Sequence, residues 1–552
     1  MLTWHRMNLQ KYSTVLIILL SLVLFSIRLF ICDHLFPDIF SYDFYGYIKL
    51  ANNIFNHFDF TVSWFLGDRV RYPPLYPILA HLLSFVMKSP IVSMQYINAA
   101  SASFYIVPLY LLVKGILNKK LAFLSVVFAT GFYGLQRPCY VLHMDYFFSF
   151  LTITICWLTW LAGQRGKPLL AFGLGVLIGL AYLTRYPAFI YCFISGSVIF
   201  ISMIRSRCDF KTALKMVLFL ALGFLPVFIA YQAVFYTPSL KNRISPVSDI
   251  GTYVFFDDNG RYGFESLYKL NPDGTEFDYL SKPGRNNIFK FSLRHPDMVE
   301  LKYINGFKKI LHMTGEAIIP FISRAANGKF YIILPALIFG GGIALMLLKG
   351  PDKILLVFLF ALSTLGIPIL SCDGRYLMPF IPLCFVLCLI MADALFNFLN
   401  ARLANGSEKI FRLGAAALYT AGIILYLGVC WQQEISFIGE KKQPYREYEQ
   451  IASWIERVAR GISSKGKIMS DRNVLAYLTD SDFIMLPSVS EGWERIIHFA
   501  KLKNVDYIIL DKPWIRRRLA YPKAKYLSFR SQIRLVYHDQ NQAGPMVFKI
   551  LP

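Results

Sequence analysis

Long apolar stretches separated by short polar segments make up most of the first three quarters of the chain. Most of these stretches are long enough to cross ~30 Å of hydrocarbon as a helix that rises ~1.5 Å per residue. The first is expected to remain as an anchor, because no small-residue cleavage site follows Cys32. The pattern therefore predicts about eleven membrane-spanning helices, with the termini on opposite sides. Their expected positions are 13–32, 92–113, 121–136, 145–163, 168–184, 187–204, 212–236, 316–348, 354–370, 376–398 and 412–431.

The last part of the chain has a different pattern, in which short stretches replace the long apolar ones. The stretches KIMS, DFIMLP, VDYIILD and RLVYHD predict strands, and NVLAYLT and EGWERIIHFAKL predict helices. We therefore expect a transmembrane domain over residues 1–431 and a small α/β domain over residues 432–552. Two long segments between spans, residues 33–91 and 237–315, are expected on the same side of the membrane as this domain.

Composition and charge exclude other classes of protein. With 56% hydrophobic and only 16% charged residues, the chain does not have the composition of a soluble protein. Lysine and arginine gather beside alternate span ends, and this side is expected to be cytoplasmic. The formal net charge of +23 follows in part from this bias and from attraction to anionic lipids, so it does not require nucleic-acid binding. The residues concerned are Arg6, Lys11, Lys114, Lys119, Lys120, Arg165, Lys167, Arg205, Arg207, Lys211, Lys349, Lys353, Arg402, Lys409 and Arg412.

The first long segment after a span contains a candidate for acid–base chemistry. Asp43 and Tyr47 are four residues apart and share one face of a predicted helix. Apolar residues recur around them at helical spacing, which predicts an amphipathic helix at the membrane surface. Asp43 can act on a substrate, or it can simply cap this helix by accepting hydrogen bonds from free backbone N–H groups. The sequence leaves both interpretations open.

Arginines recur on the outer side, where the topology rule disfavours positive charge. Acids and arginines at span ends on one side can converge on a polar cavity, and guanidinium groups suit a phosphate because they form forked hydrogen bonds. The alternative for each arginine is that it extends to the lipid headgroups, which is also how we interpret Arg28 in the first span. The outer residues are Arg71, Arg137, Arg185 and Arg375, with Asp145 and Asp373 close by in sequence.

Five motifs together resemble a known family. They are SYDFYGYIKL after the first span, RYPPLYPILAHLL behind it, YVLHMDYFFSFL, GLAYLTRYPAF and GRYLMPFIPL. Their order and common sidedness are similar to those of the integral membrane GT-C glycosyltransferases. Within these, the chain most resembles the bacterial branch related to protein O-mannosyltransferases and the lipid A aminoarabinose transferase, which is like glycosyltransferase family 39. The resemblance extends over nearly all of residues 10–510.

The resemblance implies a fold, a reaction and roles for residues. The expected fold is a GT-C transmembrane domain with an extracytoplasmic α/β domain, in a multi-pass protein of a bacterial inner (plasma) membrane with a cytoplasmic N-terminus. The expected reaction transfers a hexose or pentose from a polyprenyl-phosphate carrier to a hydroxyl on a lipid, glycan or protein. Asp43 matches the general base and Asp145 the second acidic position. Arg375 is expected to bind the carrier phosphate, with Arg185 and Arg137 as helpers. Contacts to the substrate are expected from Tyr47, Arg71, Tyr72, His143 and Asp373.

One departure from the pattern affects the acceptor and the metal. The aminoarabinose branch carries a Glu-Lys pair before a proline of the first loop, whereas this chain has Tyr72 and Pro73 before Pro74. Only one carboxylate is needed as base, so direct displacement with inversion is expected. Asp145 would orient the acceptor, tune Asp43 or help it to hold a divalent cation. Metal use stays open, because no His, Cys, Asp or Glu spacing here is typical of a closed metal site.

Two other functional classes use similar features. A polysaccharide ligase or polymerase acts on the same lipid-linked sugars, in the cell envelope pathways of lipopolysaccharide or protein glycosylation. A transporter of lipid-linked sugars also places charges within spans, although the chain shows no inverted repeat. The sequence does not identify the sugar, the carrier length, the acceptor or the oligomeric state.

Overall fold

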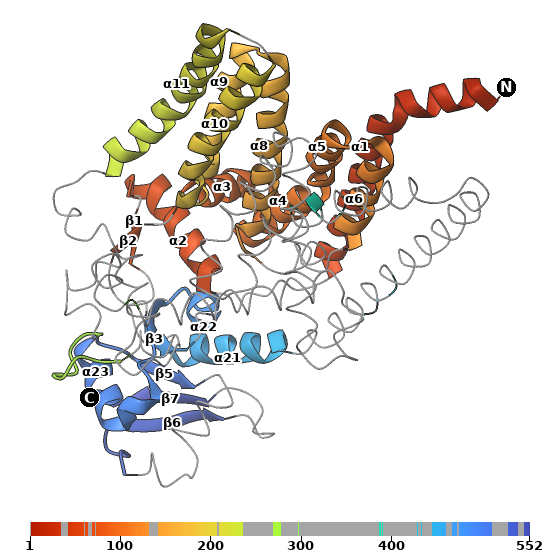
Figure 1. The fold of residues 1–552 in the computed structure, drawn as a ribbon. Coiled ribbons are helices and arrows are strands. Elements are labelled where there is room, and N and C mark those ends of the chain that lie inside the picture. Colours follow the sequence, from red (N-terminus) through yellow and green to blue (C-terminus); the bar gives the residue numbers. More distant parts are fainter. Residues whose placement is uncertain are drawn as a thin grey trace. The chain divides into compact units, whose positions relative to one another are not determined.

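The computed structural model consists of two compact units (Figure 1). The helical unit comprises Met1–Pro37, Pro73–Val234 and Tyr303–Glu440, and the sheet unit comprises Asp38–Tyr72, Phe235–Lys302 and Lys441–Pro552. The structure describes residues 2–34, 42–59, 61–63, 69–71, 73–131, 142–206, 209–235, 269–277, 444–459, 466–471, 474–510, 528–538 and 546–551, together with a few isolated positions between 296 and 432. The four spans predicted after residue 315 lie outside the described residues.

The helical unit is built from consecutive apolar helices. Five segments in its described part are long and apolar enough to cross a membrane: Ser13–Cys32, Pro90–Ile116, Asp145–Arg165, Tyr186–Arg205 and Phe210–Ala233. They confirm the membrane class, and the total of eleven spans stays a prediction. The helices are α1 (Leu2–His34), α3 (Leu75–Met87), α4 (Pro90–Phe104), α5 (Ile106–Ile116), α6 (Lys119–Gly131), α8 (Asp145–Arg165), α9 (Pro168–Tyr182), η1 (Tyr186–Phe189), α10 (Ile190–Arg205) and α11 (Phe210–Phe235).

Local sequence signals set several of these helix ends. The Ser89 hydroxyl accepts a hydrogen bond from the Val92 N–H, and proline occupies the first position of α4. Helix α8 ends at Gly166, which adopts the left-handed conformation with φ of 60°. Pro168 then begins α9, so α8 and α9 reverse direction within a short connection. The start of α8 and the end of α9 consequently lie at the same end of the unit.

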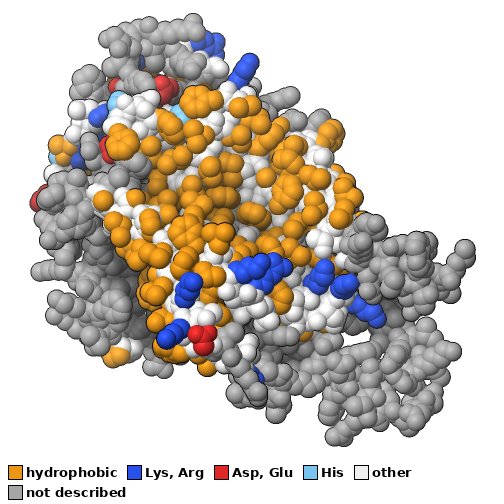
Figure 2. Space-filling model, turned by 90° about the horizontal axis from the view of Figure 1, so that it is seen from above, with side chains coloured by type: hydrophobic (Ala, Val, Ile, Leu, Met, Phe, Trp, Pro, Cys, Tyr) orange, Lys and Arg blue, Asp and Glu red, His pale blue; other side chains and the backbone are white. Residues whose placement is uncertain are grey.

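Apolar side chains are exposed along the outer helices. Figure 2 shows them covering much of one face, with Lys and Arg side chains gathered along its lower edge. Such a surface is typical of contact with lipid. The largest exposed apolar side chains of α1, α9, α10 and α11 include Val15, Leu19, Val23, Phe30, Leu169, Phe193, Phe210, Leu218, Leu222 and Ile229.

Helices α9 and α11 pack closely at two glycines. A Cβ atom added at Gly175 would lie 2.1 Å from the carbonyl oxygen of Leu220. A Cβ atom added at Gly223 would lie 2.1 Å from the carbonyl oxygen of Phe172. Small residues allow membrane helices to pack backbone against backbone. No larger residue fits at either position unless the helices separate.

Gly223→Ala is therefore expected to destabilise the helical unit by about 1–3 kcal/mol, the usual range for overpacking. The loss would appear as a lower midpoint of thermal unfolding in detergent. Gly173→Ala is the matched control, since a Cβ atom there meets nothing within 4 Å. Equal midpoints for the two variants would contradict the close contact.

The sheet unit contains a five-stranded sheet in the order β4-β3-β5-β7-β6. Strands β3, β4 and β5 are parallel, and β7 runs antiparallel to both β5 and β6. Trp493 packs against Phe548 with ring centroids 5.1 Å apart, which joins a helix to the sheet. The strands are β3 (Lys467–Ser470), β4 (Asp482–Met485), β5 (Tyr507–Leu510), β6 (Ile533–His538) and β7 (Met546–Ile550), and the helices are α21 (Pro444–Ala459), α22 (Val474–Leu478) and α23 (Gly492–Leu502).

Four of these strands coincide with the stretches from which the sequence predicts strands, and β7 is additional. The same unit includes parts of both predicted outer segments: α2 (Tyr42–His57), the antiparallel pair β1 (Thr61–Ser63) and β2 (Arg69–Arg71), and residues 269–277. The Glu491 carboxylate accepts a hydrogen bond from the Leu270 N–H at 3.1 Å, which ties the last of these segments to the start of α23. The domain boundary at residue 431 stays a prediction.

Candidate active site

A buried ion pair lies at one end of the helical unit. Asp145 is the first residue of α8 and is 1% exposed. Arg185 lies between α9 and η1, and its guanidinium donates a hydrogen bond from Nη2 to Asp145 Oδ1. The side chains of the two residues are 2% and 14% exposed. The sequence predicts that these residues share one side of the membrane, and the structure shows that they bind each other directly.

The RYPPLYP motif reaches the same place. The Leu75 N–H donates to the carbonyl of Leu183 at 3.0 Å, two residues before Arg185. The Tyr76 hydroxyl donates to Asn98 Oδ1 at 3.1 Å and is fully buried. Burial raises the pKa of Tyr76 far above its usual value, and the charge of Asp145 raises it further. Segments distant in the sequence thus meet around a group that we call the polar cluster, formed by Asp145, Arg185, Tyr76 and Asn98.

The second carboxylate oxygen of Asp145 can accept a further hydrogen bond. Oδ2 is buried and accepts no hydrogen bond from the residues that the structure describes. Buried polar atoms are nearly always satisfied, so this oxygen is suited to receive a donor from a bound molecule. A divalent cation is a poorer fit, because the adjacent guanidinium already holds the other oxygen. His143 is also buried, but no group of three potential ligands occurs within the described residues.

Tyrosines surround the chain next to Arg185. The hydroxyls of Tyr186 and Tyr231 lie 2.7 Å apart, and Gln232 Nε2 donates to the Tyr182 hydroxyl at 2.8 Å. The rings of Tyr182 and Tyr231 lie 5.6 Å apart at their centroids. Sequence reasoning missed this group, although two of its tyrosines flank the arginine in the AYLTRYPAF stretch. The group gives the end of α9 and α11 a polar, aromatic lining.

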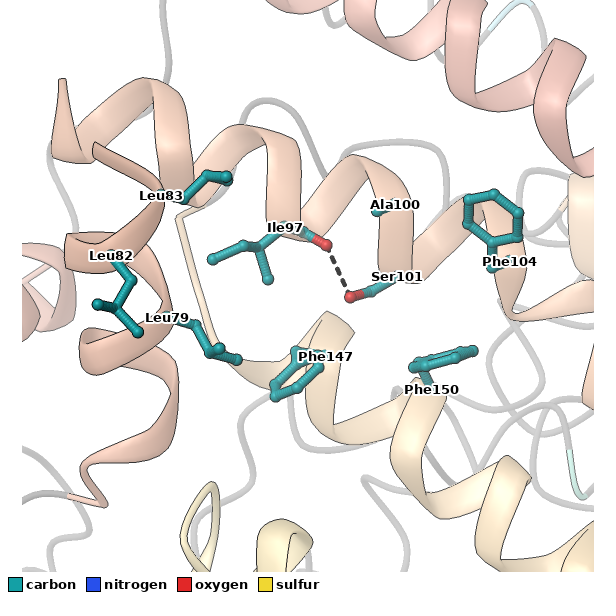
Figure 3. A pocket seen from close by; sticks show the side chains of 9 residues that line it. All are labelled: Leu79, Leu82, Leu83, Ile97, Ala100, Ser101, Phe104, Phe147 and Phe150. Atoms are coloured by element: carbon teal, nitrogen blue, oxygen red, sulfur yellow. Dashed lines mark hydrogen bonds between the residues drawn. The ribbon is translucent and has the colours of Figure 1, made fainter. Parts of the chain in front are cut away.

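An apolar groove lies on the three helices that carry Tyr76, Asn98 and Asp145. It has a volume of about 510 Å³ and lies between α3, α4 and α8 (Figure 3). The cluster residues do not line it, and Phe147, two residues after Asp145, lies about 200° from Asp145 around the axis of α8. The one polar side chain of the groove, Ser101, donates to the carbonyl of Ile97 at 2.7 Å. The lining therefore suits an apolar chain.

Asp43 lies in the first turn of α2, in the sheet unit. Only its backbone is among the described parts, so both roles predicted for it stay open. Tyr47, four residues on, is fully buried. The backbone of Arg71 lies in β2. The other predicted site residues lie outside the described residues: Arg137, Tyr72, Asp373 and Arg375.

One expectation is wrong. Arg28 does not extend to the lipid headgroups, because it is only 6% exposed and its Nη1 donates to Ser103 Oγ at 2.7 Å. Ser103 lies on α4, which packs against α1, so an acceptor is available inside the bundle. A buried arginine in a span requires such a partner.

Comparisons with known proteins agree with the motifs. A family model described as dolichyl-phosphate-mannose-protein mannosyltransferase matches residues 71–231. That stretch includes all four residues of the polar cluster and all the residues that line the groove. No curated protein sequence matches the chain.

Solved structures share the fold over nearly the whole chain. The archaeal oligosaccharyltransferase AglB from Archaeoglobus fulgidus, in complex with an inhibitory peptide and a dolichol-phosphate, is 14% identical, with a TM-score of 0.57 over 98% of this chain and 74% of that chain. ArnT from Cupriavidus metallidurans, bound to undecaprenyl phosphate, is 12% identical, with a TM-score of 0.53 over 97% of both chains. An oligosaccharyltransferase from Archaeoglobus fulgidus, solved in complex with Zn and sulfate, is 13% identical, with a TM-score of 0.55 over 97% of this chain and 73% of that chain. The family model and the shared fold confirm the resemblance of this chain to the GT-C membrane glycosyltransferases.

Proposed function

We propose that the protein transfers one sugar from a polyprenyl-phosphate carrier to a hydroxyl acceptor at the outer face of the inner membrane. The buried pair of Asp145 and Arg185, in which the second oxygen of Asp145 can still accept a hydrogen bond, is the observation that carries this proposal. Two proteins with the same fold were solved with polyprenyl phosphates, AglB with a dolichol-phosphate and ArnT with undecaprenyl phosphate. The acceptor is a lipid, a glycan or a protein.

The polar cluster supplies positive charge for the carrier phosphate. An arginine has five N–H donors, so Arg185 can hold the Asp145 carboxylate and a phosphate oxygen together. The carboxylate keeps the guanidinium oriented before the substrate binds. Arg375 and Arg137 complete the phosphate site in this proposal. Fixed positive charge in a site of low dielectric eases departure of the polyprenyl phosphate.

Asp43 acts as the base on the acceptor. A sugar hydroxyl is a poor nucleophile, and a positioned carboxylate that takes up its proton contributes about 10²–10⁴-fold in rate. One carboxylate in this role gives direct displacement with inversion. The acceptor is held by Tyr47, Arg71, Tyr72, His143 and Asp373. Any divalent cation would be bound by Asp43 rather than by Asp145 alone, because Arg185 occupies one oxygen of Asp145.

The groove receives an apolar chain of the lipid-linked donor. Ligand sites are commonly apolar clefts, and Ser101 is the one polar side chain in the lining of the groove. The groove lies on α3, α4 and α8, the same helices that contribute Tyr76, Asn98 and Asp145 to the polar cluster.

A second candidate is transfer of a preassembled glycan, as expected of a ligase or an oligosaccharyltransferase. The fold shared with the oligosaccharyltransferase AglB favours it. Incubation of the purified protein with a panel of polyprenyl-phosphate monosaccharides and polyprenyl-linked glycans separates the two. Mass spectrometry should detect free polyprenyl phosphate and an acceptor heavier by one sugar. An acceptor heavier by a whole glycan would favour the second candidate, and no release from any donor would reject both.

Topology provides a prediction that is independent of the substrate. Reporter fusions at Lys167 and Lys211 should report the cytoplasm, because both lie at the helix ends opposite Asp145 and Arg185. Fusions in the sheet unit, for example after Lys503, should report the periplasm. A cytoplasmic sheet unit would contradict the proposed outer-face reaction.

A further inference from the structure

Within the sheet unit, α2 is docked on the first residues of β4. The Tyr45 hydroxyl donates to the carbonyl of Ser481 at 3.0 Å, and its ring lies 6.1 Å from that of Phe483, edge to face. Lys49 Nζ lies 3.1 Å from Asp482 Oδ1. Residues 45 and 49 are four apart and therefore lie on one face of α2. This face contacts three consecutive residues of the C-terminal part of the chain.

The contact combines a buried anchor with an ion pair at its edge. Tyr45 is 4% exposed, whereas the side chains of Lys49 and Asp482 are 33% and 59% exposed. The Lys49 ammonium also lies 4.9 Å from the centroid of the Tyr45 ring. Burial favours a lower pKa for Lys49, but Tyr45 and Asp482 outweigh it and raise the pKa above its usual value. The shift favours the charged form of Lys49, which suits its contact with Asp482.

The surface that receives α2 is held firmly by backbone hydrogen bonds. The Ser481 N–H donates to the carbonyl of Ala476 at 2.8 Å, and the Asp482 N–H donates to the carbonyl of Gly466 at 3.1 Å. Strand β4 then pairs in parallel with β3 over its whole length. The carbonyl and carboxylate that bind α2 consequently belong to an ordered sheet edge.

The opposite face of α2 continues from Asp43. At ~100° per residue, position 43 falls about 200° from position 45 around the helix axis, away from β4. Tyr47 and Leu50, one and two turns after position 43, are both fully buried. The helix is thus held on one face by the sheet, and Tyr47 and Leu50 are buried on its other face. A rotation of α2 would break the hydrogen bond from Tyr45 to Ser481 and would displace residue 43 at the same time.

We infer that Tyr45, Lys49 and Asp482 are positioning residues, through which the C-terminal sheet fixes the helix that carries the catalytic base. The inference rests on the proposed role of Asp43. It assigns the C-terminal domain a part in catalysis, by way of the first outer segment. Misplacement of a reacting group by about 1 Å can cost ~10²-fold in rate, so loss of the contact is expected to act on turnover.

Hydrogen exchange tests the contact without any substrate. In the full-length protein, Tyr45→Ala and Asp482→Lys should accelerate amide exchange of Tyr42–His57 by about tenfold or more, while α8 is unchanged. Tyr45→Phe, which loses only the hydroxyl, should have a smaller effect and guards against a variant that fails to fold. Glu494→Gln is the matched control, since Glu494 is exposed on α23 of the same unit. Unchanged exchange in α2 would overturn the inference.

Steady-state kinetics test whether the contact between α2 and β4 affects turnover. Tyr45→Ala is expected to lower kcat by about 10–10²-fold while KM for the polyprenyl donor stays constant. Asp482→Lys should lower kcat less, and the exchanged pair Lys49→Asp with Asp482→Lys should recover most of it. An active wild type whose kcat is insensitive to these variants would overturn the inference alone. An inactive wild type with every donor would overturn the proposed function and, with it, this inference.

Discussion

Asp43→Asn is expected to lower the rate of sugar transfer by more than ~10²-fold while the protein stays folded. The reason is that an amide cannot accept the proton of the acceptor hydroxyl. Asparagine caps a helix about as well as aspartate does, so the variant keeps any capping role of this position in α2. The measurement is single-turnover transfer from a polyprenyl-phosphate sugar, together with the thermal midpoint of the same sample.

The matched control is Asp209→Asn. Asp209 is an exposed aspartate immediately before α11, so it is also an acid at the start of a helix, far along the chain from Asp43. It should leave transfer unchanged. Near wild-type transfer by Asp43→Asn would leave capping as the sole role of this aspartate and would require another base.

Arg185→Ala is expected to lower the stability of the helical unit by about 3–5 kcal/mol, the typical cost of leaving a buried charge without its partner. It should also abolish transfer, because Arg185 is proposed to bind the carrier phosphate. The double variant Asp145→Asn with Arg185→Gln should be more stable than Arg185→Ala, since no unpaired charge remains in it. It should still be inactive. Thermal unfolding in detergent and donor binding measure the two effects separately.

Arg165→Ala provides the comparison, because Arg165 is exposed at the opposite end of α8. Its removal should change stability by less than about 0.5 kcal/mol, as for most surface substitutions. Similar losses of stability for Arg165→Ala and Arg185→Ala would show that the buried ion pair stabilises the helical unit no more than an exposed arginine does. Normal transfer by Arg185→Ala would remove this arginine from the phosphate site.

The membrane class and the common end of Asp145 and Arg185 could be predicted from the sequence because both depend on local patterns. Apolar length gives the spans, and the distribution of lysine and arginine predicts which span ends share a side. These signals placed Asp145 and Arg185 at one end of the bundle. They contain nothing about rotation of a helix around its axis, so the direct bond between the two side chains could not be predicted.

Features that depend on packing were missed for the same reason. The span predicted over residues 92–113 is confirmed as the segment Pro90–Ile116, but its division at Tyr105 into α4 and α5 was not predicted. The sequence alone predicts a lipid-facing Arg28, because it does not show that Ser103 of a neighbouring helix accepts a hydrogen bond from it. The docking of Tyr45 on Ser481 joins residues that are 436 positions apart, and neither local sequence predicts the other.

That separation has a consequence for biosynthesis. A ribosome adds roughly 5–20 residues per second, so the docking partner of α2 emerges roughly 20–90 s after α2 itself. Contacts between such distant residues form late in folding, because their loop-closure entropy is recovered only when both ends are in place. In the proposed topology, the first outer segment has crossed the membrane throughout this interval but lacks its β4 contact. With the role proposed for Asp43, the nascent chain inserts its first helices before it can orient this residue, and a chain that ends before residue 481 is expected to insert into the membrane but not to turn over substrate.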